Sequence, residues 1–217
     1  LTNMTVGYGH GIAVTPMHLA SAYAAMVNGG IYRPATMLKL GDKAPPQGRR
    51  VFKASTSARM RQLLRLIVSD GTGKKAEAPG FRVGGKTGSA EKPGAGGYRR
   101  SSVVATFAAA FPMDKPRYVV IAMLDEPKGT AASSFQRTAA FNAAPIVGRV
   151  IPRIGPLLGV VPDDSRFGYR DTLIASFEAF ARSGAWTRDA QPALTPWLAG
   201  SAESHRLVPT ARSALHA

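Results

Sequence analysis

The chain has 217 residues, of which 45% are apolar and 19% are charged, and it contains no cysteine. This composition excludes a disordered tail and a disulfide-stabilised scaffold, and the lack of cysteine excludes thiol nucleophiles and thiolate metal sites. The whole net charge of +15 lies in residues 1–162, because residues 163–217 carry six basic and six acidic side chains. Such a charge attracts anions without selecting nucleic acid, acidic lipid or anionic polymer.

Helix signals occur at three places along the chain. Thr15-Pro16 predicts a capped helix start, apolar residues then recur at helical spacing up to Val27, and the Asn-Gly-Gly at 28–30 ends the helix. Residues 55–69 place apolar side chains on one face and arginines on the other, which predicts a second helix. Residues 138–158 predict an apolar helix that its prolines strain or break.

Three strands are expected between the second and third helices. The first, residues 81–88, is rich in glycine, and glycines inside a strand often mark a close approach of the backbone to a ligand. Residues 102–111 and 117–124 are apolar runs joined by a short turn-like connector, so they predict a hairpin. Residues 163–217 lack a sustained hydrophobic period, and we expect a weakly ordered extension there.

One motif in this region suggests nucleotide chemistry. The segment from Gly80 to Thr87 matches the phosphate-loop pattern G-x-x-x-x-G-K-[ST], and the apolar strand ending at Asp125-Glu126 is similar to a magnesium-binding strand. A phosphate loop needs a buried strand before it, however, and residues 72–79 are polar. It also needs a helix directly after the Lys-Thr pair, where this chain has Pro93 among several glycines. The residues around the motif thus argue against a phosphate-loop NTPase, which we keep only as the alternative interpretation.

The same residues have a second interpretation in which they form a strand. Penicillin-interacting enzymes use three elements, Ser-x-x-Lys, Ser-x-Asn and Lys-Thr-Gly, and Lys86-Thr87-Gly88 is the third. Further likeness lies in segments 7–16, 20–25, 28–30, 70–76, 84–92, 111–112, 124–127 and 143–145. In this order, the chain resembles the C-terminal half of the transpeptidase domain of class B penicillin-binding proteins, in particular the division-specific members from alphaproteobacteria. The resemblance covers about residues 3–160.

The resemblance implies an α+β fold. Residues 1–162 would form part of a β-lactamase/transpeptidase-like domain, with three antiparallel strands packed against helices, and residues 163–217 would lie outside it. Two further strands and the helices with the nucleophile would complete the family domain.

The resemblance also implies a role for each residue of the third element. Lys86 would be catalytic, supporting proton transfer around the nucleophile and attracting a carboxylate. Thr87 and Ser89 would offer their hydroxyls to the carboxylate of a stem peptide or a β-lactam, and the backbone N–H of Ser89 would be an oxyanion-hole donor. Gly85 and Gly88 would leave room for a peptide along the strand.

The function implied is that of a peptidoglycan D,D-transpeptidase, which crosslinks stem peptides through a serine ester in septal cell-wall synthesis. Its ligands would be peptidoglycan stem peptides and β-lactams, with no metal, organic cofactor or nucleic acid involved. It would act at the periplasmic face of the bacterial inner membrane, held by an anchor that this chain lacks. Its further partners would be membrane proteins of the division complex, bound through the missing N-terminal part.

One departure from the family pattern concerns the nucleophile. Neither Ser-x-x-Lys nor Ser-x-Asn occurs between Leu1 and Gly85. The sole Ser-x-x-Lys of the chain, Ser89-Ala90-Glu91-Lys92, directly follows the third element, and we interpret it as a coincidence. We therefore expect a fragment that lacks the nucleophile and is inactive by itself.

The remaining polar residues have simple interpretations. His10 and His18 have no third ligand at metal spacing, so we expect structural or solvent-facing roles. Asp125-Glu126 is expected at a strand end in solvent, with the two side chains on opposite faces. Tyr98-Arg99-Arg100 is expected to be an exposed turn. A noncatalytic basic interaction module remains a further alternative.

Overall fold

The computed structural model describes residue 6 and residues 12–44, 46–94 and 97–163. The expected extension over 163–217 therefore lies outside the described residues, apart from its first residue, as does His10. Within the described part of the chain, no helix is both long enough and apolar enough to cross a bilayer.

The first predicted helix is confirmed as α2, Pro16–Val27. Thr15 caps it, because its Oγ1 accepts a hydrogen bond from His18 N at 3.2 Å. The helix ends at Asn28, whose N–H donates to Ala24 O, and two glycines with positive φ follow. Their left-handed backbone reverses the chain at little steric cost. A two-stranded sheet of β1 (Ile31–Tyr32) and β2 (Arg49–Arg50) comes next.

The second predicted helix is confirmed as α3, Ala54–Ser69, followed by a short 3₁₀ turn η1, Lys74–Ala76. Ser57 joins α3 to the end of α2. Its hydroxyl donates to Met26 O at 2.7 Å and accepts from Gly29 N at 2.9 Å, and the residue is buried. This polar group is therefore satisfied inside the helix pair.

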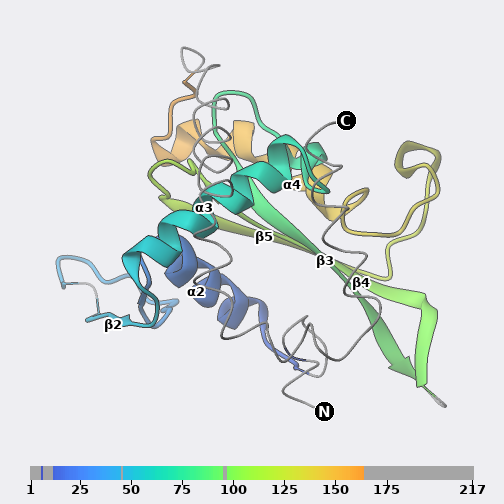
Figure 1. Cartoon of the computed structure of the whole chain (residues 1–217), viewed down its shortest axis with the longest axis horizontal. Helices are drawn as coiled ribbons and strands as arrows, with labels where there is room; N and C mark the ends of the chain where they lie inside the picture. The colour runs from blue at the N-terminus through green and yellow to red at the C-terminus, as the bar shows by residue number, and fades with distance from the viewer. Residues whose placement is uncertain (1–5, 7–11, 45, 95–96, 164–217) are drawn as a thin grey trace, which may run out of the picture. The chain divides into compact units, whose positions relative to one another are not determined.

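The three predicted strands are confirmed as one antiparallel sheet in the order β3-β4-β5 (Figure 1). Their bounds are β3 Gly84–Gly94, β4 Gly97–Phe111 and β5 Tyr118–Asp125. Strand β3 starts later than predicted, because Arg82 has a φ of 47° and its carbonyl binds Met113 N instead of a strand partner. It also runs further, past a register shift between Glu91 and Lys92, so that Pro93 pairs with Tyr98. A proline is tolerated there because β3 is an edge strand of the described sheet.

The third predicted helix is shorter than expected and forms α4, Ala143–Ile154, with a 3₁₀ turn η3 at Pro156–Leu158. Pro145 lies in the first turn, where the backbone N–H groups have no partner within the helix. Pro152 lies near the end of α4. Only the last of the three prolines falls beyond the helix, so the first two do not break it.

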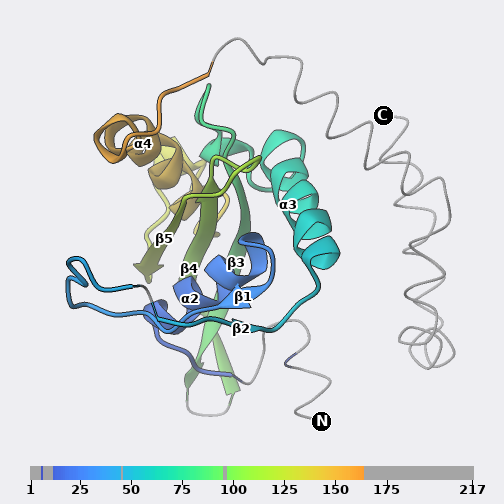
Figure 2. The ribbon, with the colours of Figure 1, turned by 90° about the vertical axis from the view of Figure 1, so that its left-hand side faces the viewer.

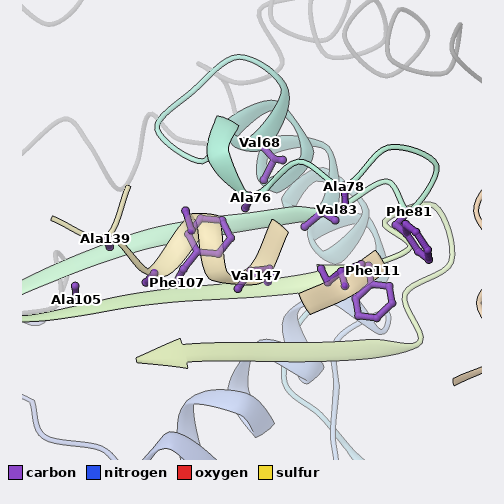
Figure 3. Packing of buried hydrophobic residues seen from close by; sticks show 14 of the residues in the cluster. Val68, Ala76, Ala78, Phe81, Val83, Ala105, Phe107, Phe111, Ala139 and Val147 are labelled. Atoms are coloured by element: carbon purple, nitrogen blue, oxygen red, sulfur yellow. The ribbon is translucent and has the colours of Figure 1, made fainter. Parts of the chain in front are cut away.

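Helix α4 closes one face of the sheet. Val147 and Ile151 of α4 pack against Phe107 and Phe111 of β4, and all four side chains are fully buried. Figure 3 shows this core together with Val83 and the alanines that let the backbones approach.

Helix α2 lies on the other face, and α3 runs along the β3 edge. Tyr23 and Val27 of α2 and Leu64 of α3 pack against Ala108 and Ala110 of β4. Figure 2 shows α2 and α4 on opposite sides of the three strands, with α3 beside β3. The structure thus confirms the α+β class, as an antiparallel sheet between two helical layers.

Candidate active site on strand β3

Strand β3 presents its side chains alternately to the two faces of the sheet. Lys86 is paired with Ala108, whose side chain faces α2, whereas Thr87 is paired with Phe107 on the α4 face. Because residues directly opposite share a face, Lys86 projects toward α2 and Thr87 projects away from it. Ser89, two residues further, lies on the same face as Thr87.

Lys86 lines a groove of about 620 Å³ on the α2 side of the sheet. The walls are mainly apolar and come from the segment before α2, from α2 itself and from all three strands. They include Ile12, Val14, Leu19, Tyr23, Gly88, Thr106 and Met123. The Lys86 ammonium donates to the carbonyl of Thr87 at 2.9 Å and to its Oγ1 at 3.3 Å. It has no ion-pair partner among the described residues, so its charge can act on a ligand in the groove.

The two hydroxyls of β3 each form a hydrogen bond with a residue far away in sequence. Thr87 Oγ1 lies 3.0 Å from Thr72 Oγ1, and Ser89 Oγ accepts from Ala139 N at 3.0 Å. A backbone N–H can only donate, so the Ser89 hydroxyl keeps its own proton for another acceptor. Ser89 is exposed and Thr87 is half-buried, so both hydroxyls can reach a ligand at the sheet edge.

The two glycines expected to leave room for a ligand have different roles. Gly88 is exposed, and the nearest atom to a Cβ added there would be Thr106 O at 3.8 Å. Gly85 is buried, and a Cβ there would lie 2.6 Å from the ring of Phe107. Gly88 therefore leaves open space along the strand, whereas Gly85 is needed for packing against the core.

The acidic pair at the end of β5 does not match the expectation from the sequence. Both residues are exposed as expected, but they are not directed apart. Lys92 Nζ binds Asp125 Oδ1 at 2.5 Å and Glu126 Oε1 at 3.1 Å. Glu126 lies beyond the strand with a φ of 49°, so the alternation of strand side chains no longer applies to it.

The same cluster shifts the ionisation of its members. The hydroxyl of Ser102 donates to Glu126 Oε1 and, with Lys92, holds the pKa of Glu126 below its usual value. Hydrogen bonds to Asp125 and Glu126 raise the pKa of Lys92. Lys92 is thus held by carboxylates, and Ser89 by a backbone amide. The Ser89-x-x-Lys92 sequence does not form a nucleophile and base pair in the structure.

The phosphate-loop interpretation also fails on the geometry. Lys86 and Thr87 lie inside β3, and the chain after them continues as a strand to Gly94. The Lys-Thr pair therefore does not open a helix, although a phosphate loop requires a helix N-terminus at this point to hold its phosphates. The residues that match the pattern form a strand with an apolar groove beside it.

Tyr23 is a residue of the groove that sequence reasoning assigned only to an apolar helix face. It is 6% exposed, and its hydroxyl has no hydrogen-bond partner among the described residues. Burial raises the pKa of Tyr23 above its ordinary range. A helical period cannot distinguish a tyrosine that packs through its ring from one whose hydroxyl needs a partner.

The other residues singled out in the sequence lie away from this site. His18 is exposed on α2, and its backbone N–H donates to the capping hydroxyl of Thr15. Tyr98 and Arg99 are exposed near the tip of the β3–β4 hairpin, in a strand and not in the expected turn. The described residues contain no group of three His, Asp or Glu side chains arranged to hold a metal ion.

Comparison with known proteins gives the family of the chain. The family model for the penicillin-binding protein transpeptidase domain matches residues 2–145. The chain belongs to this family. It is 46% identical over 168 residues to the probable peptidoglycan D,D-transpeptidase FtsI of Caulobacter vibrioides, covering 73% of this chain and 28% of that protein. It is 35% identical over 182 residues to stage V sporulation protein D of Bacillus subtilis, covering 77% of this chain and 27% of that protein.

Solved structures show the same fold. The apo transpeptidase domain of Burkholderia pseudomallei penicillin-binding protein 3 matches with a TM-score of 0.65 at 35% identity, over 73% of this chain and 47% of that chain. Penicillin-binding protein 3 from Mycobacterium tuberculosis, complexed with aztreonam, matches with a TM-score of 0.61 at 30% identity, over 73% and 38%. The chain spans less than a third of the length of these curated relatives.

Proposed function

We propose that this chain supplies the lysine- and hydroxyl-bearing strand of a peptidoglycan D,D-transpeptidase that acts in septal cell-wall synthesis. Membership of the penicillin-binding protein family supports the class of reaction. The observation that carries the assignment to β3 is the placement of Lys86 over a groove, with Thr87 and Ser89 at the sheet edge beside it. The proposed domain spans 1–162, and 163–217 would be an appended segment.

The site would bind the carboxylate at the end of a stem peptide or of a β-lactam. The O–H groups of Thr87 and Ser89 would donate to that carboxylate, and hydrogen bonds to an ionised acceptor are stronger than those between neutral groups. Lys86 would contribute its positive charge from the groove side. Gly88 would let the ligand backbone lie against the strand, because space is open at its Cβ position.

The chemistry would be acyl transfer through a serine ester. A serine oxygen would attack the penultimate D-Ala carbonyl, the terminal D-Ala would leave with a proton on its amine, and an amine of a neighbouring stem would then displace the serine. Lys86 would assist proton transfer around that serine, and the backbone N–H of Ser89 would stabilise the oxyanion. The serine would come from a Ser-x-x-Lys element outside this sequence.

The proposed setting follows from the proposed substrate. Peptidoglycan lies outside the inner membrane, so the enzyme would work at the periplasmic face, together with membrane proteins of the division complex. The basic surface of residues 1–162 suits an anionic wall polymer.

The deciding experiment has two parts. The genomic reading frame upstream of Leu1 is read and the longer product that it encodes is expressed. We expect a Ser-x-x-Lys followed by a Ser-x-Asn, and covalent labelling of that product by a fluorescent penicillin. The 217-residue chain alone should remain unlabelled. A frame without these elements, or a longer product that is not labelled, would contradict the proposal.

A matched pair of lysine variants tests the role of β3. Lys86→Ala in the longer product should reduce labelling by at least about a hundredfold, a typical contribution of a group that assists proton transfer. Lys115→Ala is the control, since Lys115 is an exposed lysine in the connector between β4 and β5. It should leave labelling unchanged. Equal labelling of both variants would remove Lys86 from the proposed mechanism.

A further inference from the structure

The turn that follows α3 holds Thr72 in a fixed position. Gly71 N and Gly73 N both donate to Ile67 O, at 3.1 and 2.9 Å, so the residues on either side of Thr72 are bound to the last turn of the helix. A Cβ on Gly71 would lie 3.0 Å from the backbone of Ile67, so a side chain is disfavoured there. The hydroxyl of Thr72 then reaches β3, where it lies 3.0 Å from Thr87 Oγ1.

We propose that Thr72 is a positioning residue that directs the hydroxyl proton of Thr87 toward the carboxylate of the ligand. This inference rests on the proposed function and names a residue to which the third sequence element assigns no role. Thr72 itself does not contact the ligand in this proposal. It acts through Thr87.

The hydrogen bonds that the Thr87 hydroxyl accepts determine where its own proton points. A hydroxyl oxygen can accept two hydrogen bonds and donates one. Lys86 Nζ already donates to Thr87 Oγ1, and the Thr72 hydroxyl is the second neighbour. If Thr72 donates, both acceptor positions of Thr87 are filled, and its own proton points out to the ligand. An ionised carboxylate selects this arrangement, because a hydrogen bond to a charged acceptor outweighs one between two hydroxyls.

The neighbouring hydroxyl shows the same arrangement with a different donor. Ser89 Oγ accepts from the backbone N–H of Ala139, which fixes the direction of that contact. In the ligand-bound arrangement, the two hydroxyls of β3 thus each receive a hydrogen bond from a loop outside the strand. At Ser89 the donor belongs to the backbone, whereas at Thr87 it is a side chain that substitution can remove.

The test compares two substitutions of Thr72 in the longer, penicillin-reactive product. Thr72→Val keeps the shape and removes the hydroxyl, and Thr72→Ser keeps the hydroxyl. Thr56→Val is the matched control, because Thr56 is exposed in the first turn of α3, about 20 Å along the helix from its C-terminal end. The second-order acylation rate is measured with benzylpenicillin and with its methyl ester, which lacks the anionic carboxylate.

We expect Thr72→Val to slow acylation by benzylpenicillin about tenfold, because the hydrogen bond from Thr87 to the ligand carboxylate is weakened. This is the order of magnitude of one hydrogen bond to a charged group. Acylation by the methyl ester should change by less than about twofold, and Thr72→Ser and Thr56→Val should both stay within about threefold of the unmodified protein. In a Thr87→Val background, Thr72→Val should have little further effect, because the group it orients is gone.

Several results would overturn the inference. Equal losses with the two ligands, or a Thr72→Ser variant as slow as Thr72→Val, would mean that Thr72 supports only the local fold. An unchanged rate for Thr72→Val would mean that Thr87 needs no orienting partner. The unmodified protein separates the two proposals: if it does not react with benzylpenicillin, the proposed function fails, whereas a reactive protein insensitive to Thr72→Val refutes only the positioning role.

Discussion

The two faces of the sheet differ in how completely the described residues cover them. On the α4 face, Phe107 and Phe111 are fully buried against Val147 and Ile151. On the α2 face the cover ends at the groove, where Ile12 is 56% exposed and Met123 is 45% exposed. The same three strands thus have one closed face and one open face.

This difference separates the residues that stabilise the fold from those that can act on a ligand. The part of a face that a helix covers holds groups that pack, since protein interiors are as dense as organic crystals. Lys86 projects to the open face, whereas the hydroxyls of Thr87 and Ser89 lie on the α4 side of β3, where Thr87 is half-buried and Ser89 is exposed. The chemistry of β3 is therefore found where the helical cover stops.

The largest contrast between the faces should come from truncating an apolar side chain on each. Phe107→Ala on the closed face should lower the free energy of unfolding by about 3–5 kcal/mol, because it leaves a cavity between the sheet and α4. Met123→Ala on the open face should cost less than about 1 kcal/mol, since nearly half of that side chain is already in water. Urea denaturation of the 217-residue chain measures both. Similar costs would mean that the α2 face is packed as well as the α4 face.

The two glycines of β3 give a second contrast. Gly85→Ala should destabilise the chain by about 1–3 kcal/mol, because the new methyl group would overlap the ring of Phe107. Gly88→Ala should leave stability within about 1 kcal/mol, since a strand interior prefers alanine to glycine where space allows. In the longer product, Gly88→Ala should still slow acylation by penicillin, because the methyl group enters the groove. A stable and fully reactive Gly88→Ala variant would argue against ligand binding along this strand.

Tyr23 offers a smaller, pH-dependent test of the open face. Its folded-state pKa is raised by burial, so the phenol ionises more readily in the unfolded chain, and stability should fall as the pH rises above about 10. Tyr23→Phe should remove this part of the alkaline loss, and below pH 9 it should change the free energy of unfolding by less than about 1 kcal/mol. Denaturation curves at pH 8 and pH 10.5 test both statements. A clear loss of stability at pH 8 would indicate that the hydroxyl has a partner.

The smallest expected effect lies at the end of the sheet, where neither face is involved. Glu126 has a lowered pKa, chiefly through the hydrogen bond from Ser102 and then through Lys92. Its contribution to stability is therefore present above the pKa of the unfolded side chain and is lost as the pH falls through the folded one. Ser102→Ala should raise the Glu126 pKa toward its ordinary value, as measured by NMR titration of the carboxyl carbon. A pKa that does not move would assign the shift to Lys92 alone.

Features set by neighbouring residues could be predicted from the sequence. The start of α2 is an example, because Thr15 caps the helix three residues away and Pro16 is suited to its first turn. The position of Lys86 on a strand could also be predicted, from the glycines and proline that exclude a helix after it. The end of β3 could not, because Pro93 and its glycines normally end a strand. Here they are kept in it by pairing with β4.

The partners of the site hydroxyls could not be predicted, since they depend on how distant segments meet. Thr72 lies 15 residues from Thr87, and Ala139 lies 50 residues from Ser89. No local sequence pattern predicts that the backbone N–H of Ala139 will donate a hydrogen bond to the Ser89 hydroxyl. The role of Gly85 could not be predicted either. Glycine is required both where a ligand approaches the backbone and where a core side chain such as Phe107 does, so the sequence does not distinguish the two.

The ion pairs of Lys92 connect the two outer strands of the sheet. Strand β5 ends at Asp125, whereas β3 and β4 continue beyond it as a two-stranded ribbon, which twists more freely than the interior of a sheet. Lys92 binds both carboxylates at the end of β5, across the intervening strand. Lys92 thus links β3 to the end of β5 three residues from Ser89, at the point where the two-stranded ribbon begins. Ser89 therefore lies in the three-stranded part of the sheet, and Lys92 marks the end of that part.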